Sequence, residues 1–169
     1  LATSSGDCVI KVWDLMQVSC AMTFREHSQP IWSIDFNFSG DFLVAGAVDH
    51  CCRMYDIHYG KLRYTFRGHV DSVNNVKFSR YNNTFMSAST DKTLSMWDIR
   101  TGLLCNTLYG HTSGINSIAL SADENRMVSV DTEGVVKCWD LRKWKLENEI
   151  DCGPHPANGV DLDPSGKFG

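Results

Sequence analysis

The sequence predicts an all-β repeat protein, and three observations support that prediction. Short runs rich in β-branched and aromatic residues alternate with turn-forming residues, and no long segment carries apolar residues at a helical spacing. A histidine recurs every 42 residues, at His27, His69 and His111. An aromatic residue followed by Asp keeps the same step, at Trp13, Tyr55, Trp97 and Trp139. A repeat of this length that ends in Trp-Asp is typical of a β-propeller, whose four-stranded sheets, the blades, pack face to face.

The most regular unit runs from Gly68 and His69 to Trp97 and Asp98. Strand-forming runs at 73–78 and 84–89 are separated by turn-forming residues at 80–83, and a tight turn at 90–92 leads to a third run at 93–98. In the first run we expect residues 73, 75 and 77 on one face and 74, 76 and 78 on the other, although a strand buried between two blades can be apolar on both faces.

The other units repeat this order of strands. The first unit has strands at 1–5, 9–14 and 19–24, and the second at 31–36, 42–47, 51–56 and 61–66. A strand at 103–108 completes the third unit, and the fourth has strands at 115–120, 126–131, 135–140 and 146–150. A fifth unit begins with a strand at 158–162 and a turn at 164–166.

The repeat divides the chain into blades. Residues 1–25 end one blade, residues 26–67, 68–109 and 110–151 form three whole blades, and residues 152–169 start the next. A closed propeller has about four to eight blades. The chain begins in mid-strand without Met and stops before the next strand, so both ends look cut. We expect an incomplete arc of about four blades from a seven-bladed propeller, closed by the same chain or by a second one.

Composition excludes several classes of function. The net charge of −4 and the pI near 5.8 argue against general nucleic-acid binding, which needs a basic surface. A membrane span would require a run of about 18 apolar residues, and the sequence has none. The 7 cysteines show no C-x-x-C spacing and are spread over different repeats. Free thiols in a reducing compartment are the natural interpretation, so we expect a cytoplasmic or cytoskeletal protein.

A histidine, a serine and an aspartate in one unit could suggest a nucleophilic triad. The candidates are His69, Ser87 or Ser89, and Asp91, with Trp97 close by. The same set recurs, as His111, Ser129 and Trp139 in one unit and as Ser5, Asp7 and Trp13 in another. An enzyme needs one active site, whereas a repeated polar set serves a repeated structural role. We therefore predict a structural hydrogen-bond network, no catalytic residue, no cofactor and no small-molecule substrate.

These residues resemble the WD40 repeat family, whose repeats carry a histidine, a serine or threonine, an aspartate and a tryptophan in one hydrogen-bonded network. The resemblance implies a structural network and a surface that binds other proteins. The unit at 68–109 matches all four positions. The second unit departs from the pattern with Ala45, Ala47 and Tyr55. The fourth has Glu133 at the aspartate position, with Asp131 two residues earlier, and the fifth has Gly153 at the histidine position. The departures put the network in doubt in those units.

A narrower resemblance covers most of the chain. It rests on the stretches "GHVDSVNNVKF", "STDKTLSMWDIRTG" and "IDCGPHPANGVDLDPSGK", the last with an unusual Gly153-Pro154 pair. These stretches are similar to the WD-repeat proteins of the ciliary central apparatus, the sperm-associated antigen family of motile axonemes. That resemblance implies a non-enzymatic scaffold at the central-pair microtubules of the cilium or flagellum. The alternatives are an adaptor elsewhere, such as a substrate receptor of a ubiquitin ligase, and an enzyme of propeller fold.

One surface candidate is the position five residues after each histidine. It is occupied by Trp32, Asn74, Asn116 and, by register, Asn158. The resemblance places this position at one mouth of the central channel, together with the residues before the turn aspartate, among them Thr90. An exposed tryptophan is a typical interface anchor, but it could equally wedge against the neighbouring blade.

Two further clusters have an ordinary interpretation beside a functional one. Arg142, Lys143 and Lys145 surround a tryptophan after the fourth repeat. They could meet an acidic surface such as a tubulin tail, or they could form a solvated turn. Residues 50–52 read His-Cys-Cys and could be soft metal ligands. Neighbouring strand residues face opposite sides, so we interpret them as ordinary strand residues and predict no metal site.

Overall fold

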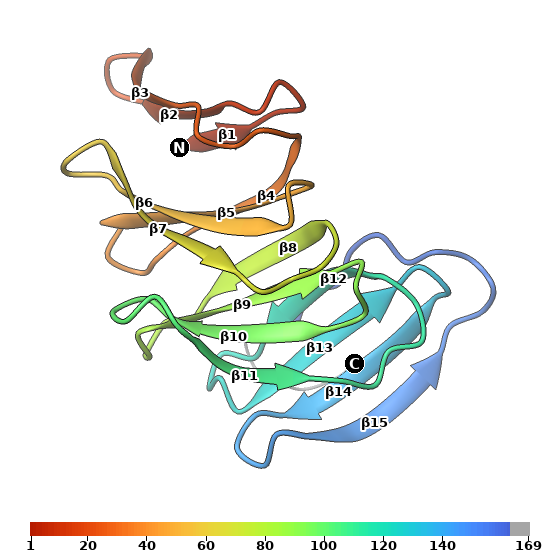
Figure 1. Ribbon diagram of the computed structural model, residues 1–169. Helices are drawn as coiled ribbons and strands as arrows, with labels where there is room; N and C mark the ends of the chain where they lie inside the picture. The colour runs from red at the N-terminus through yellow and green to blue at the C-terminus, as the bar shows by residue number, and fades with distance from the viewer. Residues whose placement is uncertain (163–169) are drawn as a thin grey trace.

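The computed structural model describes residues 1–162, which form four antiparallel sheets and, over that range, no helix (Figure 1). Sheet one contains β1 (Ala2–Ser4), β2 (Ile10–Asp14) and β3 (Ser19–Phe24). Sheet two contains β4 (Ile31–Phe36), β5 (Phe42–Ala47), β6 (Cys51–Asp56) and β7 (Lys61–Arg67). Sheet three contains β8 (Val73–Phe78), β9 (Thr84–Ser89), β10 (Leu94–Asp98) and β11 (Leu104–Leu108). Sheet four contains β12 (Ile115–Leu120), β13 (Arg126–Asp131), β14 (Val135–Asp140) and β15 (Lys145–Asp151).

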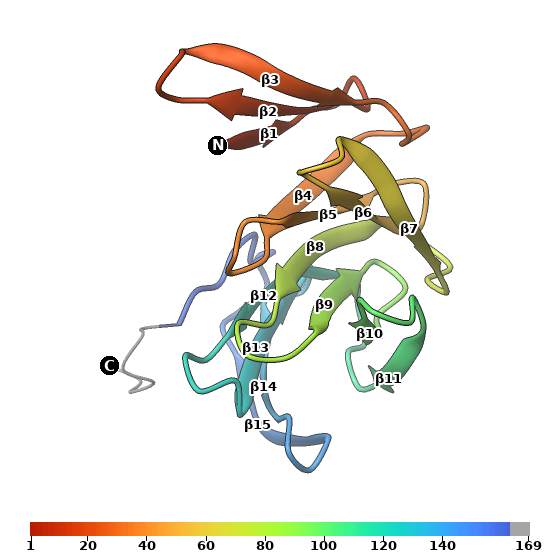
Figure 2. The same cartoon turned by 90° about the vertical axis from the view of Figure 1, so that its left-hand side faces the viewer.

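The sheets follow one another in chain order, with sheet one at one end of the molecule and sheet four at the other (Figure 2). In each sheet the strands lie in sequence order, so every connection within a sheet is a hairpin. This arrangement confirms the predicted all-β fold and is that of an incomplete propeller. No helix in the described range is long and apolar enough to cross a membrane.

The strand predictions from β1 to β15 agree with the structure within one residue at each end. One further prediction was wrong. Residues 158–162 are not a strand, although they run beside β12, where the Val160 N–H donates to Ser117 Oγ at 3.4 Å. A strand needs a regular ladder with its neighbour, and contacts to side chains do not supply one. The predicted turn at 164–166 lies outside the described residues.

The predicted alternation in residues 73–78 was also wrong, because a β-bulge interrupts β8. Val73 pairs with Ser89 and Asn75 with Ala88, so Asn74 is left out of the ladder. A bulge shifts the two-residue period by one, and Val73 therefore lies in the same core as Val76. Equivalent bulges occur in β4 and β12, between Ile31 and Ser33 and between Ile115 and Ser117.

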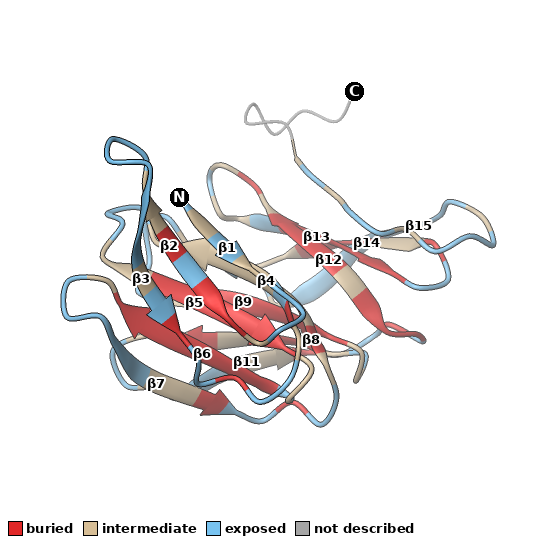
Figure 3. Ribbon diagram, turned by 90° about the horizontal axis from the view of Figure 1, so that it is seen from above, coloured by how far each residue is buried: buried red, intermediate tan, exposed pale blue. Residues whose placement is uncertain are grey.

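Apolar side chains fill the three seams between neighbouring sheets. Burial is deepest along the middle strands, whereas the outer strand β15 is exposed along its whole length (Figure 3). The seam between sheets two and three is the most aromatic, with Phe66, Phe85 and Trp97 in mutual contact. Direct hydrogen bonds cross the same seam near the channel. The N–H of Val76 donates to Ser33 Oγ at 3.2 Å, and the N–H of Phe78 donates to Asp35 at 2.8 Å.

Candidate functional site

The polar residues predicted in sheet three form one continuous hydrogen-bonded chain. His69 Nδ1 donates to Asp91 Oδ2 at 2.7 Å, and Ser87 Oγ donates to His69 Nε2 at 2.7 Å. The indole N–H of Trp97 then donates to Ser87 Oγ at 2.8 Å. Ser89 is not part of this chain, because its hydroxyl binds the loop carbonyl before β8 and the Asp91 N–H. Ser87 is therefore the serine that connects the ring to the indole.

The Asp91 carboxylate also shapes the turn that carries it. It accepts hydrogen bonds from the Val70 N–H and from both the N–H and the hydroxyl of Thr93. Burial opposes ionisation of Asp91, but the hydrogen bonds from His69, Thr93 and Val70 outweigh it and hold its pKa well below the usual range. The charged carboxylate thus joins the turn after β9 to the loop before β8.

Sheet four contains the same hydrogen-bonded network, but its carboxylate comes from a different position than the sequence suggested. His111 bonds Asp131 at 2.8 Å and Ser129 at 2.6 Å, and Trp139 donates to Ser129 at 2.8 Å. The carboxylate comes from Asp131, the last residue of β13, and not from the turn position of Glu133. Because Asp131 also accepts the N–H of Val135, the register equivalent of Thr93, at 2.9 Å, it replaces Asp91 both in binding the ring and in closing the turn. The network is therefore complete in this sheet, contrary to the doubt raised by the sequence.

The geometry of this hydrogen-bonded network favours a structural role over nucleophilic chemistry. Ser87 and Ser129 have relative exposures of 0%, and each hydroxyl lies between an imidazole and an indole. A nucleophilic serine must present its oxygen to a substrate, with the histidine free to take the proton. Here the oxygen already accepts the indole N–H, so the chain satisfies buried polar groups within each sheet.

Sheet two has a different arrangement around the equivalent histidine. Arg53 Nη1 lies 2.5 Å from both Asp49 Oδ2 and His27 Nδ1. Burial is the main cause that lowers the pKa of His27 to about 4, so its ring is neutral near pH 7. His27 Nδ1 also lies 3.1 Å from Asp49 Oδ2, so the contact between histidine and aspartate found in sheet three is kept here and the guanidinium is added to it.

Two buried polar groups of sheet two have no hydrogen-bond partner among the described residues. They are His27 Nε2 and the Tyr55 hydroxyl. Ala45 stands where Ser87 stands in sheet three and has no hydroxyl to connect them. The predicted weakness of the network in this sheet therefore corresponds to one missing hydroxyl, that of residue 45.

Sheet one has a reduced version of the network. Trp13 donates its indole N–H to Thr3 Oγ1 at 2.9 Å, so the hydroxyl comes from Thr3 and not from Ser5. Asp7 accepts the Val9 N–H at 3.1 Å and closes its turn in the same way as Asp91. At the next repeat, Gly153 occupies the histidine position in the loop after β15, so this repeat has no imidazole for the hydrogen-bond network.

The three bulged positions are the same surface positions that the sequence analysis singled out. Asn74 Nδ2 donates to Ile115 O at 2.8 Å and to Thr90 Oγ1 at 3.0 Å. Asn116 Nδ2 donates to the carbonyl of residue 157 at 2.9 Å. Asn74 therefore connects sheet three to sheet four, and Asn116 connects sheet four to the segment that follows β15. Trp32 has no such role and is 60% exposed, although sheets flank it on both sides.

The basic segment after β14 forms a tight turn. The Asp140 carboxylate accepts the backbone N–H groups of Arg142 and Lys143 at 2.8 and 3.1 Å. Arg142 Nε donates to Asn125, and Lys143 Nζ lies 3.7 Å from Asp140. Lys145 is exposed at the start of β15. The structure therefore uses part of the positive charge locally and leaves the rest in solvent.

The His-Cys-Cys segment has no metal-site geometry. His50 is exposed with φ of 63°, at a turn, whereas Cys51 and Cys52 are buried in β6. Burial raises the pKa of the Cys52 thiol far above its usual range, so the thiol remains protonated. Among residues 1–162, no group of three or more His, Cys, Asp or Glu side chains is arranged to hold a metal ion.

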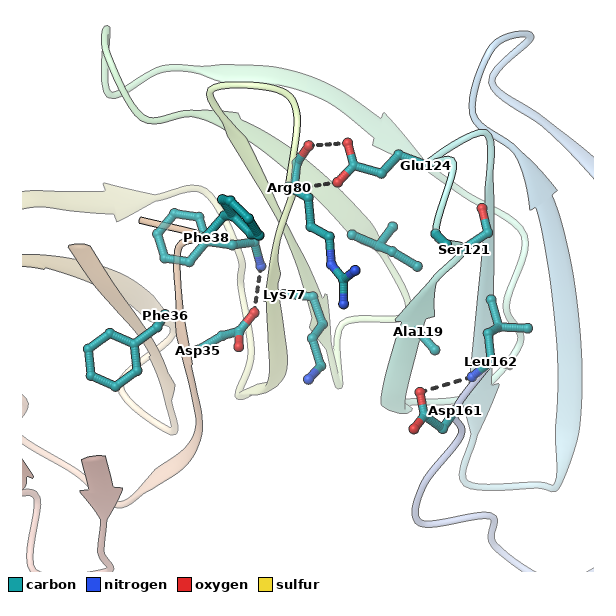
Figure 4. A pocket seen from close by; sticks show the side chains of 14 residues that line it. Asp35, Phe36, Phe38, Lys77, Arg80, Ala119, Ser121, Glu124, Asp161 and Leu162 are labelled. Atoms are coloured by element: carbon teal, nitrogen blue, oxygen red, sulfur yellow. Dashed lines mark hydrogen bonds between the residues drawn. The ribbon is translucent and has the colours of Figure 1, made fainter. Parts of the chain in front are cut away.

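Sequence reasoning missed a cavity of about 390 Å³ at the opposite ends of the inner strands (Figure 4). Four of its lining residues stand 42 positions apart, at Asp35, Lys77, Ala119 and Asp161. Arg80 extends into the space between Lys77 and Ala119. The repeat register could have identified this ring, because equivalent inner-strand residues in a propeller surround one channel.

Comparison with known proteins gives a family and several relatives. A family model described as "WD domain, G-beta repeat" matches residues 18–56, 60–98 and 102–140. The THO complex subunit 3 of Arabidopsis thaliana is 27% identical over 60 residues, which are 36% of this chain and 19% of that protein. The eukaryotic translation initiation factor 3 subunit I of Schizosaccharomyces pombe (strain 972 / ATCC 24843) is 34% identical over 61 residues, 36% of this chain and 19% of that protein.

A third relative is similar over a comparable stretch. The periodic tryptophan protein 2 of Arabidopsis thaliana is 32% identical over 56 residues, which are 33% of this chain and 6% of that protein. The chain thus matches less than a fifth of the length of each of these relatives.

Proposed function

The chain belongs to the WD40 repeat family, and from this premise we propose that it is a protein-interaction scaffold without catalytic activity of its own. Trp32 is the observation that carries the proposal. A large aromatic side chain 60% exposed on a bulged inner strand offers contact area on a rigid support. Two of the relatives are named as subunits of multiprotein complexes, which agrees with a scaffold role.

The assembly we propose is the central apparatus of motile cilia and flagella. The support is the resemblance of three stretches to the WD-repeat proteins of that apparatus, one of them spanning the loop before β8 and all of β8. On this proposal the partners are the central-pair microtubules and their associated proteins, and the location is the axonemal cytoskeleton. Partner contacts would involve the end of the sheets that carries Trp32.

A second candidate is an adaptor in another cytoplasmic complex. The named relatives favour it, because THO complex subunit 3 and translation initiation factor 3 subunit I belong by name to other assemblies. The candidates share the same scaffold chemistry and differ in the partner that binds the exposed surface.

Fractionation of ciliated cells that express the tagged full-length protein distinguishes them. For the axonemal scaffold, the tag remains with detergent-extracted axonemes and disappears from axonemes that lack the central pair. Recovery of the tag only in a soluble complex, with none on axonemes, would support the second candidate. A monodisperse protein that joins no complex in either fraction would contradict the scaffold function itself.

A further inference from the structure

An exposed serine in the loop before β4 lies beside the buried ionic contact of sheet two. Both the N–H and the hydroxyl group of Ser28 donate to Asp49 Oδ2, at 3.2 and 3.5 Å. The same carboxylate oxygen accepts Arg53 Nη1 at 2.5 Å. The serine hydroxyl and the guanidinium thus share one contact atom, so a group attached to Ser28 Oγ would come within reach of Arg53.

The guanidinium of Arg53 has donors to spare. Among the described residues only its Nη1 forms hydrogen bonds, with Asp49 and His27. A guanidinium carries five N–H donors in a fork that matches the oxygens of a phosphoryl group. Because Arg53 is largely buried, solvent would screen such a pair only weakly. Arg53 is therefore able to bind a phosphoryl group and to keep its contact with Asp49.

The segment around Ser28 is accessible to a protein kinase. Residues 25–30 connect β3 to β4 outside any strand, and Arg25, Ser28 and Gln29 are exposed. Protein kinases select substrates by the pattern of charge around the acceptor hydroxyl, and many of them require an arginine three residues before it. Arg25 stands at that distance from Ser28.

Among sheets two, three and four, only sheet two combines these parts. The position of Ser28 is occupied by Val70 in the third repeat, which has no hydroxyl, and by Thr112 in the fourth. Thr112 has Tyr109 three residues before it in place of the arginine. The cation of that sheet, Lys137, is already bound by a glutamate at 2.5 Å. The arrangement at Ser28 is thus not a general property of the repeat.

We propose that Ser28 is a phosphorylation site and that Arg53 binds the phosphoryl group. A kinase would transfer the γ-phosphoryl group of ATP. The bond from the serine oxygen to phosphorus forms, the bond from phosphorus to the departing ADP breaks, and the hydroxyl proton passes to a base of the kinase. Asp49 repels the added charge and Arg53 attracts it. The hydrogen bonds that only the guanidinium can donate decide in favour of the contact.

Phosphorylation at this position would change the surface that surrounds Trp32. Trp32 follows Ser28 by only four residues. The loop between them is tied to the turn that carries Asp49, because Pro30 O accepts the N–H of Val48 at 2.9 Å. A kinase would thus alter the interface without touching the tryptophan. This consequence rests on the scaffold function proposed above, whereas the modification and its contact with Arg53 do not.

Mass spectrometry of the full-length protein, purified from its own cells in the presence of phosphatase inhibitors, tests the modification. We expect phosphate on Ser28, complete loss of it in Ser28→Ala and a strong reduction in Arg25→Ala, which leaves the acceptor in place. Ser28 found only without phosphate, or modified equally in Arg25→Ala, would overturn the proposed site.

The contact with Arg53 is tested by ³¹P NMR on full-length protein that carries phosphoserine at residue 28, introduced by genetic-code expansion. A guanidinium favours the dianion, so the second pKa of the phosphate should lie about one unit below its value of about 6 in a short phosphoserine peptide. Arg53→Gln should restore the peptide value. If that variant fails to fold, Arg53→Lys keeps the charge without the fork and should reduce the shift.

No shift in the wild type, or an undiminished shift in the Arg53 variants, would overturn the assignment of Arg53. Both experiments are independent of any partner. Their failure with normal association in cells leaves the scaffold function standing, and phosphorylation of a protein that joins no complex contradicts the scaffold function alone.

Discussion

The indole of Trp97 packs so closely on the backbone of Gly68 that a Cβ atom at residue 68 would lie 2.9 Å from Cη2 of the ring. The same relationship recurs one repeat later, where a Cβ on Gly110 would lie 3.2 Å from Cη2 of the equivalent tryptophan. In sheet two the smaller ring of Tyr55 is accompanied by Glu26 at the glycine position. The Gly-His pair at the start of a repeat is therefore required by the length of the indole.

Gly68→Ala should lower the free energy of unfolding by about 1–3 kcal/mol, because the added methyl group overpacks a buried aromatic ring. Urea denaturation of the full-length protein measures the change. Gly6→Ala is the matched control, since no atom lies within 4 Å of a Cβ placed there. Equal stability of the two variants would show that the contact with Trp97 relaxes without cost.

Ser87→Ala should destabilise the protein by about 1–3 kcal/mol, since it removes the hydroxyl that binds both His69 and Trp97. The reverse change in sheet two, Ala45→Ser, should stabilise by about 1 kcal/mol by supplying a partner to the buried Tyr55 hydroxyl. Thermal melts of both variants test the pair. Ala88→Ser is the control, because it buries a hydroxyl in an apolar core and should destabilise. Loss of stability in Ala45→Ser equal to that of the control would contradict the role assigned to the missing hydroxyl.

Acidification from pH 7 to pH 4.5 should lower the free energy of unfolding by about 2 kcal/mol through the titration of His27. An unfolded histidine has a pKa of 6.5, whereas burial keeps folded His27 unprotonated down to about pH 4. The unfolded state therefore binds more protons in this range, and stability falls as the pH falls. Burial also lowers the pKa of His111, which adds a change of the same sign. Urea titrations at the two pH values measure the loss.

The matching variant for the pH experiment is His27→Gln, which removes the titrating ring and should reduce the pH dependence. The lowered pKa of Asp91 acts in a different window, since its stabilisation is present above the unfolded value of 3.8 and disappears only at lower pH. An unchanged pH slope in His27→Gln would assign the effect to another group.

On the axonemal proposal, Trp32→Ala should weaken docking of the full-length protein onto axonemes prepared from cells without this protein by about 2 kcal/mol or more. The melting temperature should stay unchanged. Simultaneous changes of Arg142, Lys143 and Lys145 to Ser should retain docking at physiological salt, because part of this charge is satisfied locally. Cosedimentation with axonemes measures both. Loss of docking in the triple variant alone would indicate electrostatic docking instead.

Much of the fold could be predicted from the sequence because its signals are local and repeated. Turn residues and β-branched runs set the strand ends, and the 42-residue step assigns His69 and Asp91 to one repeating unit. The bulge at Asn74 could not be predicted in this way. The same bulged position is occupied by Asn74 in β8 and by Trp32 in β4, so no residue type marks it in the sequence.

The composition of the polar network was only partly predictable for a related reason. A carboxylate can reach the same ring nitrogen from different backbone positions, so Asp131 replaces the turn residue that register alone suggests. The presence of Arg53 beside His27 and Asp49 carried a sequence signal. It is a charged residue in the middle of a strand expected to be buried on both faces.

The seam hydrogen bonds have a consequence for how the protein is made. They join residues 41 or 43 positions apart, as in Asn74 with Ile115 and Val76 with Ser33. A growing chain on the ribosome therefore needs only one further repeat before each new sheet can dock on the one already folded. Assembly can proceed in the order of translation, without waiting for distant segments, and each completed sheet covers the apolar face of its predecessor while the rest is still being synthesised.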